Sequence, residues 1–358
     1  MSERFSIEKL KATLSRHGQE HVLAFWDELD EAGRQQLADQ LAGIDWDRLG
    51  TWIRECVHSK TGSPVPAHVQ PAAYRELEPP EAAEQEAYAA AKEHGRDLLR
   101  AGKVAAFTVA GGQGTRLGYD APKGTFPITP IRKKPLFQVF AESILRAQEK
   151  YDSPPILWVI MTSSLNDDDT RAFFADNDYF GLSKDNVVFV CQGLLPAISF
   201  DGRLLLSSKD SLALAPNGHG GTFEALHRSG ALQRMRAAGV EHISYWQVDN
   251  PLVKIFDPLF IGLHDMQQSD MSCRSLTKTD PYEKLGNFCV CDGCVYVIEY
   301  SDMDPERCEA RDASGHLLYR AGSPAIHILR RDFVERLTSN GGPDLPLHRA
   351  EKKVRFID

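Results

Sequence analysis

The chain has 358 residues, of which 42% are apolar and 25% are charged, a composition typical of a soluble globular protein. Its net charge of −9 at pH 7 argues against a nucleic-acid-binding protein, because such a protein needs a broad basic face. No apolar run is long enough to cross a bilayer and residues 1–10 lack the apolar core of a secretion signal, so we expect no membrane partner. The seven cysteines are an odd number without framework spacing, which favours the reducing cytoplasm.

Residues 1–101 are predicted to form an N-terminal helical region and a linker. Apolar residues recur at helical spacing over the first part, where Trp26, Trp46 and Trp52 are expected to form the core of a small bundle. The proline-rich stretch 64–80 has the composition of a surface linker, and the alanine-rich stretch that follows is predicted to be a helix ending at Gly102.

Residues 102–340 alternate apolar strands with amphipathic helices. This pattern predicts an α/β fold with a mixed, mostly parallel sheet that is covered on both faces, and ligands bind beyond the carboxyl ends of the strands in such sheets. The predicted strands lie near 104–110, 156–162, 186–192, 242–248, 270–277, 287–291, 294–300 and 324–329. The predicted helices lie near 135–150, 167–176, 221–238, 257–268 and 331–338.

The most informative stretch is 104–127, which reads VAAFTVAGGQGTRLGYDAPKGTFP. A buried strand is predicted to end at Ala110 and to be followed by Gly111, Gly112 and Gly114, with Gly118 just beyond. Glycines allow a ligand to approach the main chain, and amides freed at such a turn form a nest for phosphate oxygens. Two cations, Arg116 and Lys123, follow the loop, which points to a site for a multiply charged phosphate compound.

Two common phosphate motifs do not fit this stretch. Its spacing is G-x-G-x-x-x-G, one residue longer than the dinucleotide fingerprint, and Lys123 stands between a proline and a glycine, which is not the P-loop pattern. The alternative without function is a tight strand-to-helix turn.

A second polar position follows the predicted strand 242–248. Asp249 and Asn250 come directly after it, and a carboxylate at a strand end that faces a phosphate loop is suited to holding Mg²⁺ between substrate phosphates. Asp and Asn also favour helix caps and turns, which is the alternative explanation.

Two further stretches are candidates for nucleotide contact. Gly218, His219 and Gly220 open the predicted helix at 221–238, and glycine-rich helix starts attract anions. Gln192 ends another predicted strand, and its amide offers both the donor and the acceptor that recognition of a uracil edge requires. An ordinary helix entry and a surface glutamine are the plain alternatives.

Two further segments, one charged and one rich in cysteine, each have a functional and a purely structural interpretation. Glu283, in the loop KTDPYEKLG, is suited to accepting hydrogen bonds from sugar hydroxyls, and the alternative is a solvated turn. Cys289, Cys291 and Cys294 resemble zinc ligands in spacing, but the fourth ligand of a closed site is missing and a hairpin turning at 292–293 is favoured.

Together these pieces resemble eukaryotic-type UDP-N-acetylglucosamine pyrophosphorylase, within the wider UDP-sugar pyrophosphorylase group. The resemblance spans nearly the whole chain and rests on ordered matches: HGQEHVLAFWDEL, VAGGQGTRLG, PKG, MTSS, FFADNDYFGL, QGLLP, GGTFEAL, QVDNPLVKIFDPLFIG, YEKLG, VIEYSDM and LPLHRAEKKV.

The resemblance implies a Rossmann-like nucleotidyltransferase core. It also implies a reaction in which UTP and a sugar 1-phosphate, N-acetylglucosamine 1-phosphate first among them, give a UDP-sugar and pyrophosphate with Mg²⁺. It places Ala110, Gly111 and Gly112 on the uridine, with Gln192 on the uracil. By the same resemblance Arg116 and Lys123 meet the phosphates, Asp249 the nucleotide and metal, and Glu283 the sugar.

The chain departs from the family pattern at three places. The family motif reads GNGG, and His219 stands here in place of its asparagine. Ser323 and Ile326 stand in place of the two asparagines of the family motif GNI-x-NH. The family continues beyond residue 358 with a phosphate-binding lysine, so 341–358 is interpreted as the start of a truncated C-terminal segment.

These departures leave other functions open. They are a UTP–glucose-1-phosphate or broad-specificity pyrophosphorylase, a UDP-sugar-binding protein without activity, and a relative that transfers a guanylyl or adenylyl group. We expect a cytoplasmic monomer or weak homo-oligomer.

Overall fold

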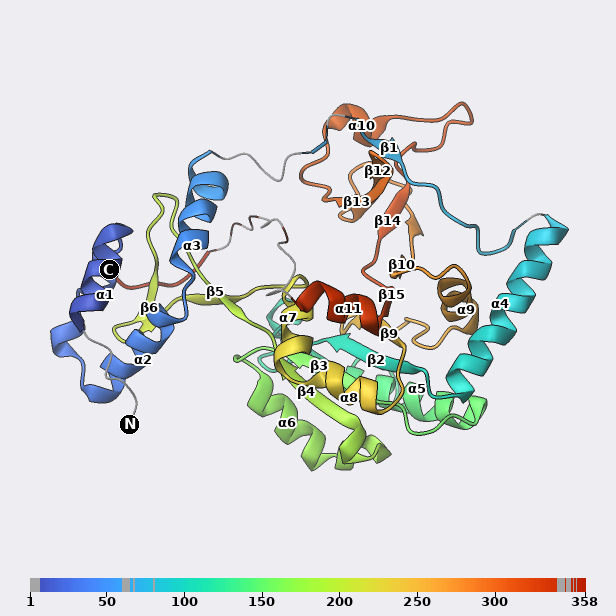
Figure 1. Cartoon of the computed structure of the whole chain (residues 1–358), viewed down its shortest axis with the longest axis horizontal. Helices are drawn as coiled ribbons and strands as arrows, with labels where there is room; N and C mark the ends of the chain where they lie inside the picture. Colours follow the sequence, from blue (N-terminus) through green and yellow to red (C-terminus); the bar gives the residue numbers. More distant parts are fainter. Residues whose placement is uncertain are drawn as a thin grey trace. The chain divides into compact units, whose positions relative to one another are not determined.

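The structure is a computed structural model that describes residues 7–59, 65–66, 68–79, 81–339, 345, 349, 351 and 353–358. The chain forms two compact units, and each is described by itself (Figure 1). Unit 1 contains residues 1–65, 194–217 and 345–358, and unit 2 contains residues 66–193 and 218–344. The expected boundaries at 101 and 340 follow chain order, whereas the observed units combine segments that are distant in sequence. Much of the expected segment 341–358, together with Pro64 and Pro80 of the predicted linker, lies outside the described residues.

Unit 1 is a small helical bundle that packs against a β-hairpin region. Its core contains leucines from the N-terminal helices together with Leu204, Leu206 and Leu212 from the 194–217 insertion. The three tryptophans expected in this core are partly buried and pack against it. Ile357 pairs with Leu206, so the C-terminal segment joins the same unit. The elements are α1 (Ile7–Arg16), α2 (Glu31–Ala42), α3 (Trp46–Trp52), β5 (Leu194–Pro196), β6 (Leu206–Ser208), β7 (Ser211–Leu212) and β8 (Leu214–Pro216).

Unit 2 is organised around a six-stranded mixed sheet, in agreement with the predicted α/β fold. The strand order is β10-β15-β9-β2-β3-β4, in which β9, β2, β3 and β4 are parallel and β15 and β10 are antiparallel. Strand β2 lies between β9 and β3. Nearly every residue of β2 is buried, because helices cover both faces of the sheet there. The strands are β2 (Val104–Val109), β3 (Trp158–Thr162), β4 (Val187–Cys191), β9 (His242–Gln247), β10 (Met271–Cys273) and β15 (His327–Arg330).

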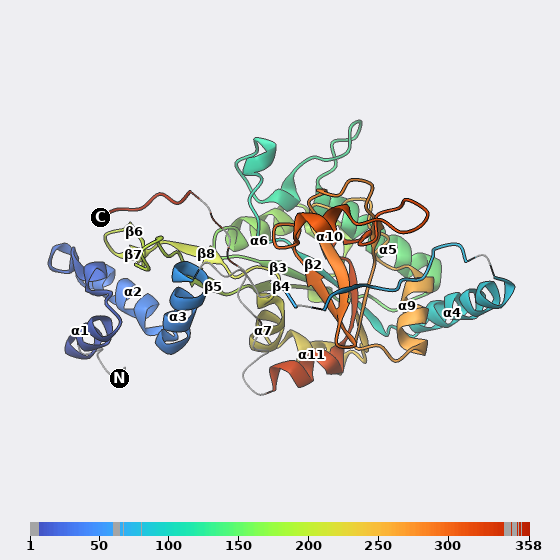
Figure 2. The same cartoon turned by 90° about the horizontal axis from the view of Figure 1, so that it is seen from above.

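Two separate hydrophobic clusters cover the two faces of this sheet. One face packs against α4, α5, α6 and α9, and the other packs against α7, α8 and α11. Figure 2 shows α5 and α6 on one side of the strands and α7 and α11 on the other. The helices are α4 (Ala82–Arg100), α5 (Leu136–Tyr151), α6 (Asp167–Asp176), α7 (Gly221–Arg228), α8 (Ala231–Ala237), α9 (Pro258–Met266) and α11 (Arg331–Thr338).

The helix predicted at 221–238 is two helices. The break falls at Gly230, whose φ of 76° is left-handed, a conformation that glycine adopts without strain. The apolar spacing continues across the break because α7 and α8 both pack on the same face of the sheet. For this reason hydrophobic periodicity alone predicted one helix.

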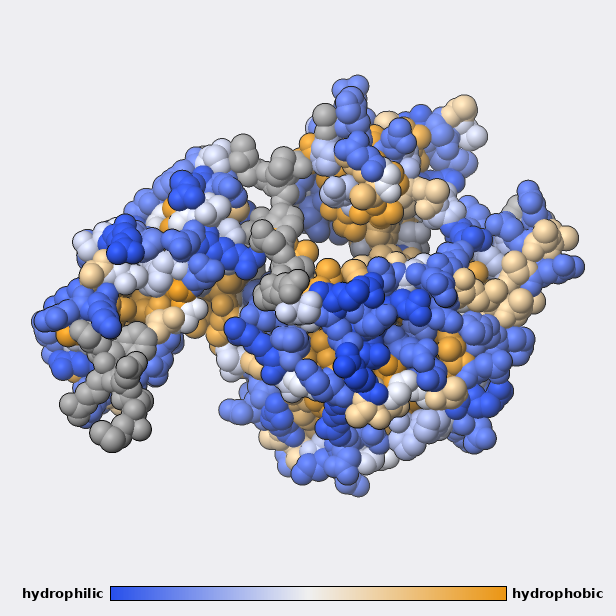
Figure 3. All heavy atoms as spheres, viewed as in Figure 1, coloured by the Kyte–Doolittle hydropathy of each residue, from blue (hydrophilic) through white to orange (hydrophobic). Residues whose placement is uncertain are grey.

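A smaller sheet stands apart from the main one within unit 2. The predicted cysteine hairpin is present in it, with Asp292 and Gly293 in left-handed conformations at the turn. Such a turn matches the twist of the paired strands. In Figure 3 apolar surface gathers on the part of unit 2 that carries this sheet. Its elements are β1 (Gln70–Pro71), β11 (Leu276–Thr277), β12 (Gly286–Cys291), β13 (Cys294–Ile298) and β14 (Ala321–Ser323), with α10 (Pro305–Glu309) nearby in the chain.

Helix α4 crosses α9 at very short range. A Cβ on Gly95 would lie 1.9 Å from the carbonyl oxygen of Pro258, and one on Gly262 would lie 1.7 Å from that of Ala91. Because both positions face backbone, neither accepts a side chain without moving a helix. Within the described residues no helix is long and apolar enough to cross a membrane.

Two buried histidines face each other between the main sheet and a helix, His242 at the start of β9 and His264 in α9. His242 and His264 have ring centroids 5.2 Å apart, and the Nε2 atom of His242 is 3.2 Å from a carboxylate oxygen of Asp265. Burial lowers the pKa of His264 to about 3 and also lowers the pKa of His242. Both side chains are therefore neutral in the folded protein at neutral pH.

These histidines make stability depend on pH. Unfolded histidines take up protons near pH 6.5, so we expect the free energy of unfolding to fall as pH drops from about 6.5 towards 3, by up to about 1.4 kcal/mol per pH unit for His264. His242 acts in the same direction. Urea unfolding at several pH values measures this slope. His264→Gln should flatten it, whereas exposed His316→Gln should leave it unchanged. A wild-type slope equal to that of His264→Gln would contradict the assignment.

Candidate functional site

The glycine loop after β2 is held from behind by side chains that follow β3. Asn166 Nδ2 donates to the carbonyl oxygen of Ala110 at 2.9 Å, and Ser163 Oγ donates to that of Gly111 at 2.8 Å. The carbonyl oxygen of Gly112 accepts a hydrogen bond from the backbone N–H of Lys123 at 3.1 Å. Three successive carbonyls of the loop are thus tied back into the protein.

The amides of Gly111 and Gly112 form no hydrogen bond within the part of the chain that the structure describes. Unpaired N–H groups at a turn, with their carbonyls turned away, are the geometry of an anion nest. The loop ends at Gly114, whose N–H donates to Ala121, and continues into a 3₁₀ turn, Thr115–Leu117, that carries Arg116 on its exposed side. The predicted phosphate loop therefore has the local structure that phosphate binding needs.

Lys123 and Asp249 meet although they are distant in the sequence. The Nζ atom of Lys123 is 3.0 Å from a carboxylate oxygen of Asp249, which follows β9, and the lysine side chain is only 19% exposed. The contact arises because β2 and β9 are parallel neighbours whose carboxyl ends share one edge of the sheet. Asn250 continues the turn after Asp249 and donates its N–H to Gln247. Arg116 takes part in none of the ion pairs among the described residues.

Gln192 lies against the same loop. It is 6% exposed, and its Oε1 atom has no hydrogen-bond partner among the described residues. A Cβ placed on Gly111 would lie 2.0 Å from Gln192 Nε2, so the glutamine amide rests on the loop backbone. An unpaired buried oxygen is costly unless a ligand satisfies it.

The second glycine cluster leads into α7. Gly218 has a φ of 73°, a left-handed conformation that favours glycine, and Gly220 precedes the first residue of the helix. His219 between them is an exposed residue whose ring reaches inward to a partly buried hydrogen bond between Nδ1 and the phenol oxygen of Tyr245 on β9. Burial lowers the pKa of His219, while the charge of Asp249 acts in the opposite direction.

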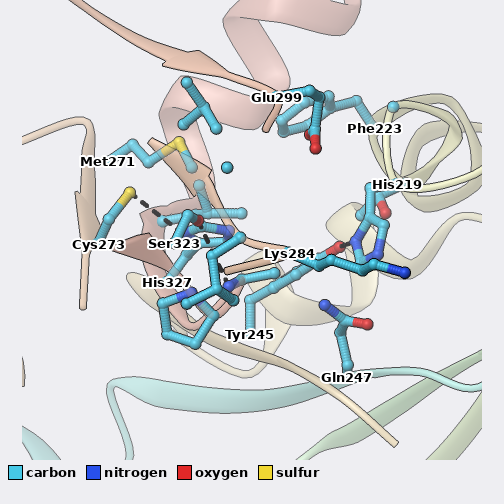
Figure 4. A pocket seen from close by; sticks show the side chains of 18 residues that line it. His219, Phe223, Tyr245, Gln247, Met271, Cys273, Lys284, Glu299, Ser323 and His327 are labelled. Atoms are coloured by element: carbon cyan, nitrogen blue, oxygen red, sulfur yellow. Dashed lines mark hydrogen bonds between the residues drawn. The ribbon is translucent and has the colours of Figure 1, made fainter. Parts of the chain in front are cut away.

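A cavity of about 530 Å³ lies between the main sheet and the smaller sheet of unit 2 (Figure 4). This volume is within the usual range for small-molecule sites. Most of its wall is apolar, and the polar groups on it come from five separate segments. The residues that line it are His219, Gly220, Thr222, Phe223, Tyr245, Gln247, Met271, Cys273, Lys284, Leu285, Gly286, Val297, Glu299, Ser323, Pro324, Ala325, His327 and Leu329.

The acidic residue on this cavity is Glu299, and sequence reasoning did not single it out. Figure 4 shows the carboxylate of Glu299 on the cavity wall. Glu283, which was expected to hold the sugar, is absent from the lining, and its carboxylate accepts a long 3.4 Å hydrogen bond from the N–H of Thr279. Ser323, a candidate substrate-binding residue, does line the cavity. The available signal for Glu299 was a carboxylate directly after the apolar strand β13.

Ser163 and Asn166 are two further residues that sequence reasoning missed. Asn166 directly precedes α6 and supports the phosphate loop. The polar residues that follow the predicted strand 156–162 were the available signal. No three histidine, cysteine, aspartate or glutamate side chains in the described ranges are grouped to hold a metal ion.

This arrangement defines an α/β protein of the nucleotidyltransferase type, with a glycine loop after the central strand and a carboxylate after its parallel neighbour. Residues 60–355 match the family described as UTP--glucose-1-phosphate uridylyltransferase. The chain belongs to this family.

Among its relatives is a mouse (Mus musculus) protein named UDP-N-acetylhexosamine pyrophosphorylase-like protein 1, which is 36% identical over 98% of this chain and 71% of its own. A Schizosaccharomyces pombe protein named probable UDP-N-acetylglucosamine pyrophosphorylase is 39% identical over 74% of this chain and 57% of its own.

Among solved structures, a UDP-N-acetylglucosamine pyrophosphorylase from Trypanosoma brucei has a TM-score of 0.80 at 25% identity, covering 95% of this chain and 69% of its own. A putative one from Entamoeba histolytica has a TM-score of 0.73 at 32% identity, covering 81% of this chain and 72% of its own. These comparisons confirm the predicted family and fold.

Proposed function

We propose that the protein joins UTP and a sugar 1-phosphate, N-acetylglucosamine 1-phosphate first among them, to give a UDP-sugar and pyrophosphate. The observation that carries the proposal is the glycine loop beside Lys123 and Asp249. Its carbonyls are tied back, while the amides of Gly111 and Gly112 have no partner among the described residues. Family membership and the names of the relatives support the same reaction.

The nucleotide is assigned to the loop. The unpaired amides and the Lys123 ammonium meet phosphate oxygens of UTP, and the buried Oε1 of Gln192 accepts a hydrogen bond from the uracil edge. The phosphate of the sugar attacks the α-phosphorus, and pyrophosphate leaves. That phosphate is already an anion, so no general base is needed, and positioning and charge stabilisation supply the catalysis.

Mg²⁺ fits this site only together with the substrate. Asp249 is a single carboxylate, and no group of three potential ligands lies in the described residues. Mg²⁺ commonly takes one or two carboxylates and completes its octahedron with phosphates and water, so Asp249 would hold the ion against UTP. When bound, the ion neutralises developing phosphate charge.

The sugar is assigned to the cavity of about 530 Å³. Glu299 and Ser323 offer groups for sugar hydroxyls, and the apolar part of the wall suits an N-acyl group. We also infer a cytoplasmic protein, which is supported by cysteines that form no disulfide within the described residues.

A panel of nucleoside triphosphates crossed with sugar 1-phosphates, read by pyrophosphate release, tests the proposal. We expect release with UTP and N-acetylglucosamine 1-phosphate in the presence of Mg²⁺. A preference for glucose 1-phosphate would correct the sugar, and a preference for GTP or ATP would correct the base. Tight binding of the UDP-sugar without any turnover would make the chain a binding protein instead.

Gly111→Ala tests the contact between loop and glutamine. The added methyl group would lie 2.0 Å from Gln192 Nε2 and would displace the amide, so we expect the KM for UTP to rise about tenfold through one lost hydrogen bond. Steady-state kinetics measures this change.

Gln192→Ala is the matched variant because it removes the same amide directly. The double variant should be no worse than either single variant, since both act on one contact. Additive losses in the double variant would show that Gly111 and Gln192 act separately.

A further inference from the structure

The histidine at the entrance of α7 is held by a tyrosine from the middle of the sheet. His219 Nδ1 makes its hydrogen bond to the phenol oxygen of Tyr245, which is 4% exposed on β9. The phenol ring stacks on Phe107 of β2, with centroids 5.3 Å apart and planes at 10°. Because the tyrosine ring is fixed by packing in the sheet, its hydroxyl is a fixed partner for the histidine.

The two side chains allow either direction for this hydrogen bond, and we take the phenol as the donor. Burial raises the pKa of Tyr245 well above its usual value, so the phenol keeps its proton. Burial also lowers the pKa of His219, so the imidazole is neutral and has one donor and one acceptor nitrogen. With the phenol O–H donating to Nδ1, the ring proton is placed on Nε2.

The position of His219 indicates what its Nε2–H meets. The side chain lines the cavity, where Figure 4 shows it beside Lys284 and above Gln247. It also lies close enough to Asp249 for that carboxylate to act on it, and Asp249 pairs with Lys123 at the phosphate loop. His219 thus stands between the cavity assigned to the sugar and the loop assigned to UTP. A sugar 1-phosphate spanning the two places its phosphate there.

We propose that Tyr245 is a positioning residue that holds His219 in the tautomer with its proton on Nε2, so that Nε2–H donates to a phosphate oxygen of the sugar 1-phosphate. The inference rests on the proposed function for the identity of the acceptor. The tautomer itself does not depend on any substrate. A neutral donor orients the attacking phosphate without pairing a full positive charge with its nucleophilic oxygen.

The tautomer is measured on the full-length protein without ligand, by two-dimensional NMR of isotopically labelled histidine nitrogens. His219→Gln identifies the signals of this residue by their loss. We expect wild-type His219 to be protonated on Nε2, and Tyr245→Phe, which keeps the ring, to shift it towards protonation on Nδ1. A wild-type His219 protonated on Nδ1 would overturn the inference even if Tyr245→Phe did not fold.

Tyr296→Phe is the matched control, because it removes a hydroxyl from an exposed tyrosine of β13 that does not line the cavity. It should leave the His219 signals in place. An equal change in both variants would show that the effect is not specific to the Tyr245 hydroxyl and would overturn the inference.

Kinetics then tests the acceptor. Tyr245→Phe should raise the KM for the sugar 1-phosphate about tenfold and leave the KM for UTP within about twofold. An active wild-type enzyme with no such change would overturn the positioning role. A wild-type protein with no turnover would instead overturn the proposed function, while the tautomer measurement would still stand as a result about Tyr245.

Discussion

Lys123→Gln is expected to lower kcat by about two to three orders of magnitude, the loss that follows removal of one preorganised charge from a transition state. The ammonium lies 3.0 Å from Asp249, and the backbone N–H of Lys123 donates to the carbonyl oxygen of Gly112, so the residue is held at the loop before any ligand arrives. Glutamine is one bond shorter than lysine and keeps a donor, but it removes the charge. Steady-state pyrophosphate release measures the change.

Lys133→Gln is the matched control, because Lys133 is an exposed lysine of the same unit outside the site. Its kcat should stay within about twofold of wild type. If Lys123→Gln kept wild-type kcat with an unchanged unfolding midpoint, the assignment of this lysine to the developing phosphate charge would be wrong.

Asp249→Asn is the second substitution with a large expected effect. Asparagine preserves the shape and the hydrogen bond from Lys123 but removes the negative charge that Mg²⁺ needs. We expect kcat/KM to fall about 100-fold or more and the half-saturating Mg²⁺ concentration to rise about tenfold. A Mg²⁺ titration of the rate at saturating UTP separates the two effects.

Asp168→Asn serves as the comparison, since this exposed carboxylate lies in the first turn of α6 and outside the site. It should leave the Mg²⁺ dependence unchanged. An Asp249→Asn variant with a wild-type Mg²⁺ curve would remove Asp249 from the metal and would leave it only the pairing with Lys123.

Much of the fold could be predicted from local residue patterns in the sequence. The apolar runs that became β2, β3, β4 and β9 are short, β-branched and bounded by polar residues, so their type and limits were predictable. The turn at Asp292 and Gly293 was predictable for the same reason, because only certain residues adopt its left-handed geometry.

Long-range assembly was not predictable in this way. Unit 1 brings the N-terminal helices together with the 194–217 insertion and Ile357. The hydrophobic periodicity of one segment does not indicate which distant segment packs against it. The break at Gly230 is another case, because both helices present apolar residues to one face.

Some residues of the candidate site could likewise be predicted from the sequence, and others could not. The loop glycines, Lys123 and Asp249 are chemically distinctive where they stand in the chain, and the structure brings Lys123 and Asp249 together. Glu299 and Tyr245 become candidates only because they line a cavity that several segments of the chain form together. A glutamate that follows an apolar strand and a tyrosine inside a strand are both common, and the sequence offered no reason to prefer Glu299 to Glu283.

The most direct test follows the α-phosphorus of UTP. The protein is mixed with Mg²⁺, N-acetylglucosamine 1-phosphate and UTP that carries a radioactive α-phosphorus, and the products are separated. The account predicts that the label moves into UDP-N-acetylglucosamine while unlabelled pyrophosphate is released, and that Lys123→Gln suppresses both together. Label that stays in UTP, or that appears in UMP without any UDP-sugar, would contradict it.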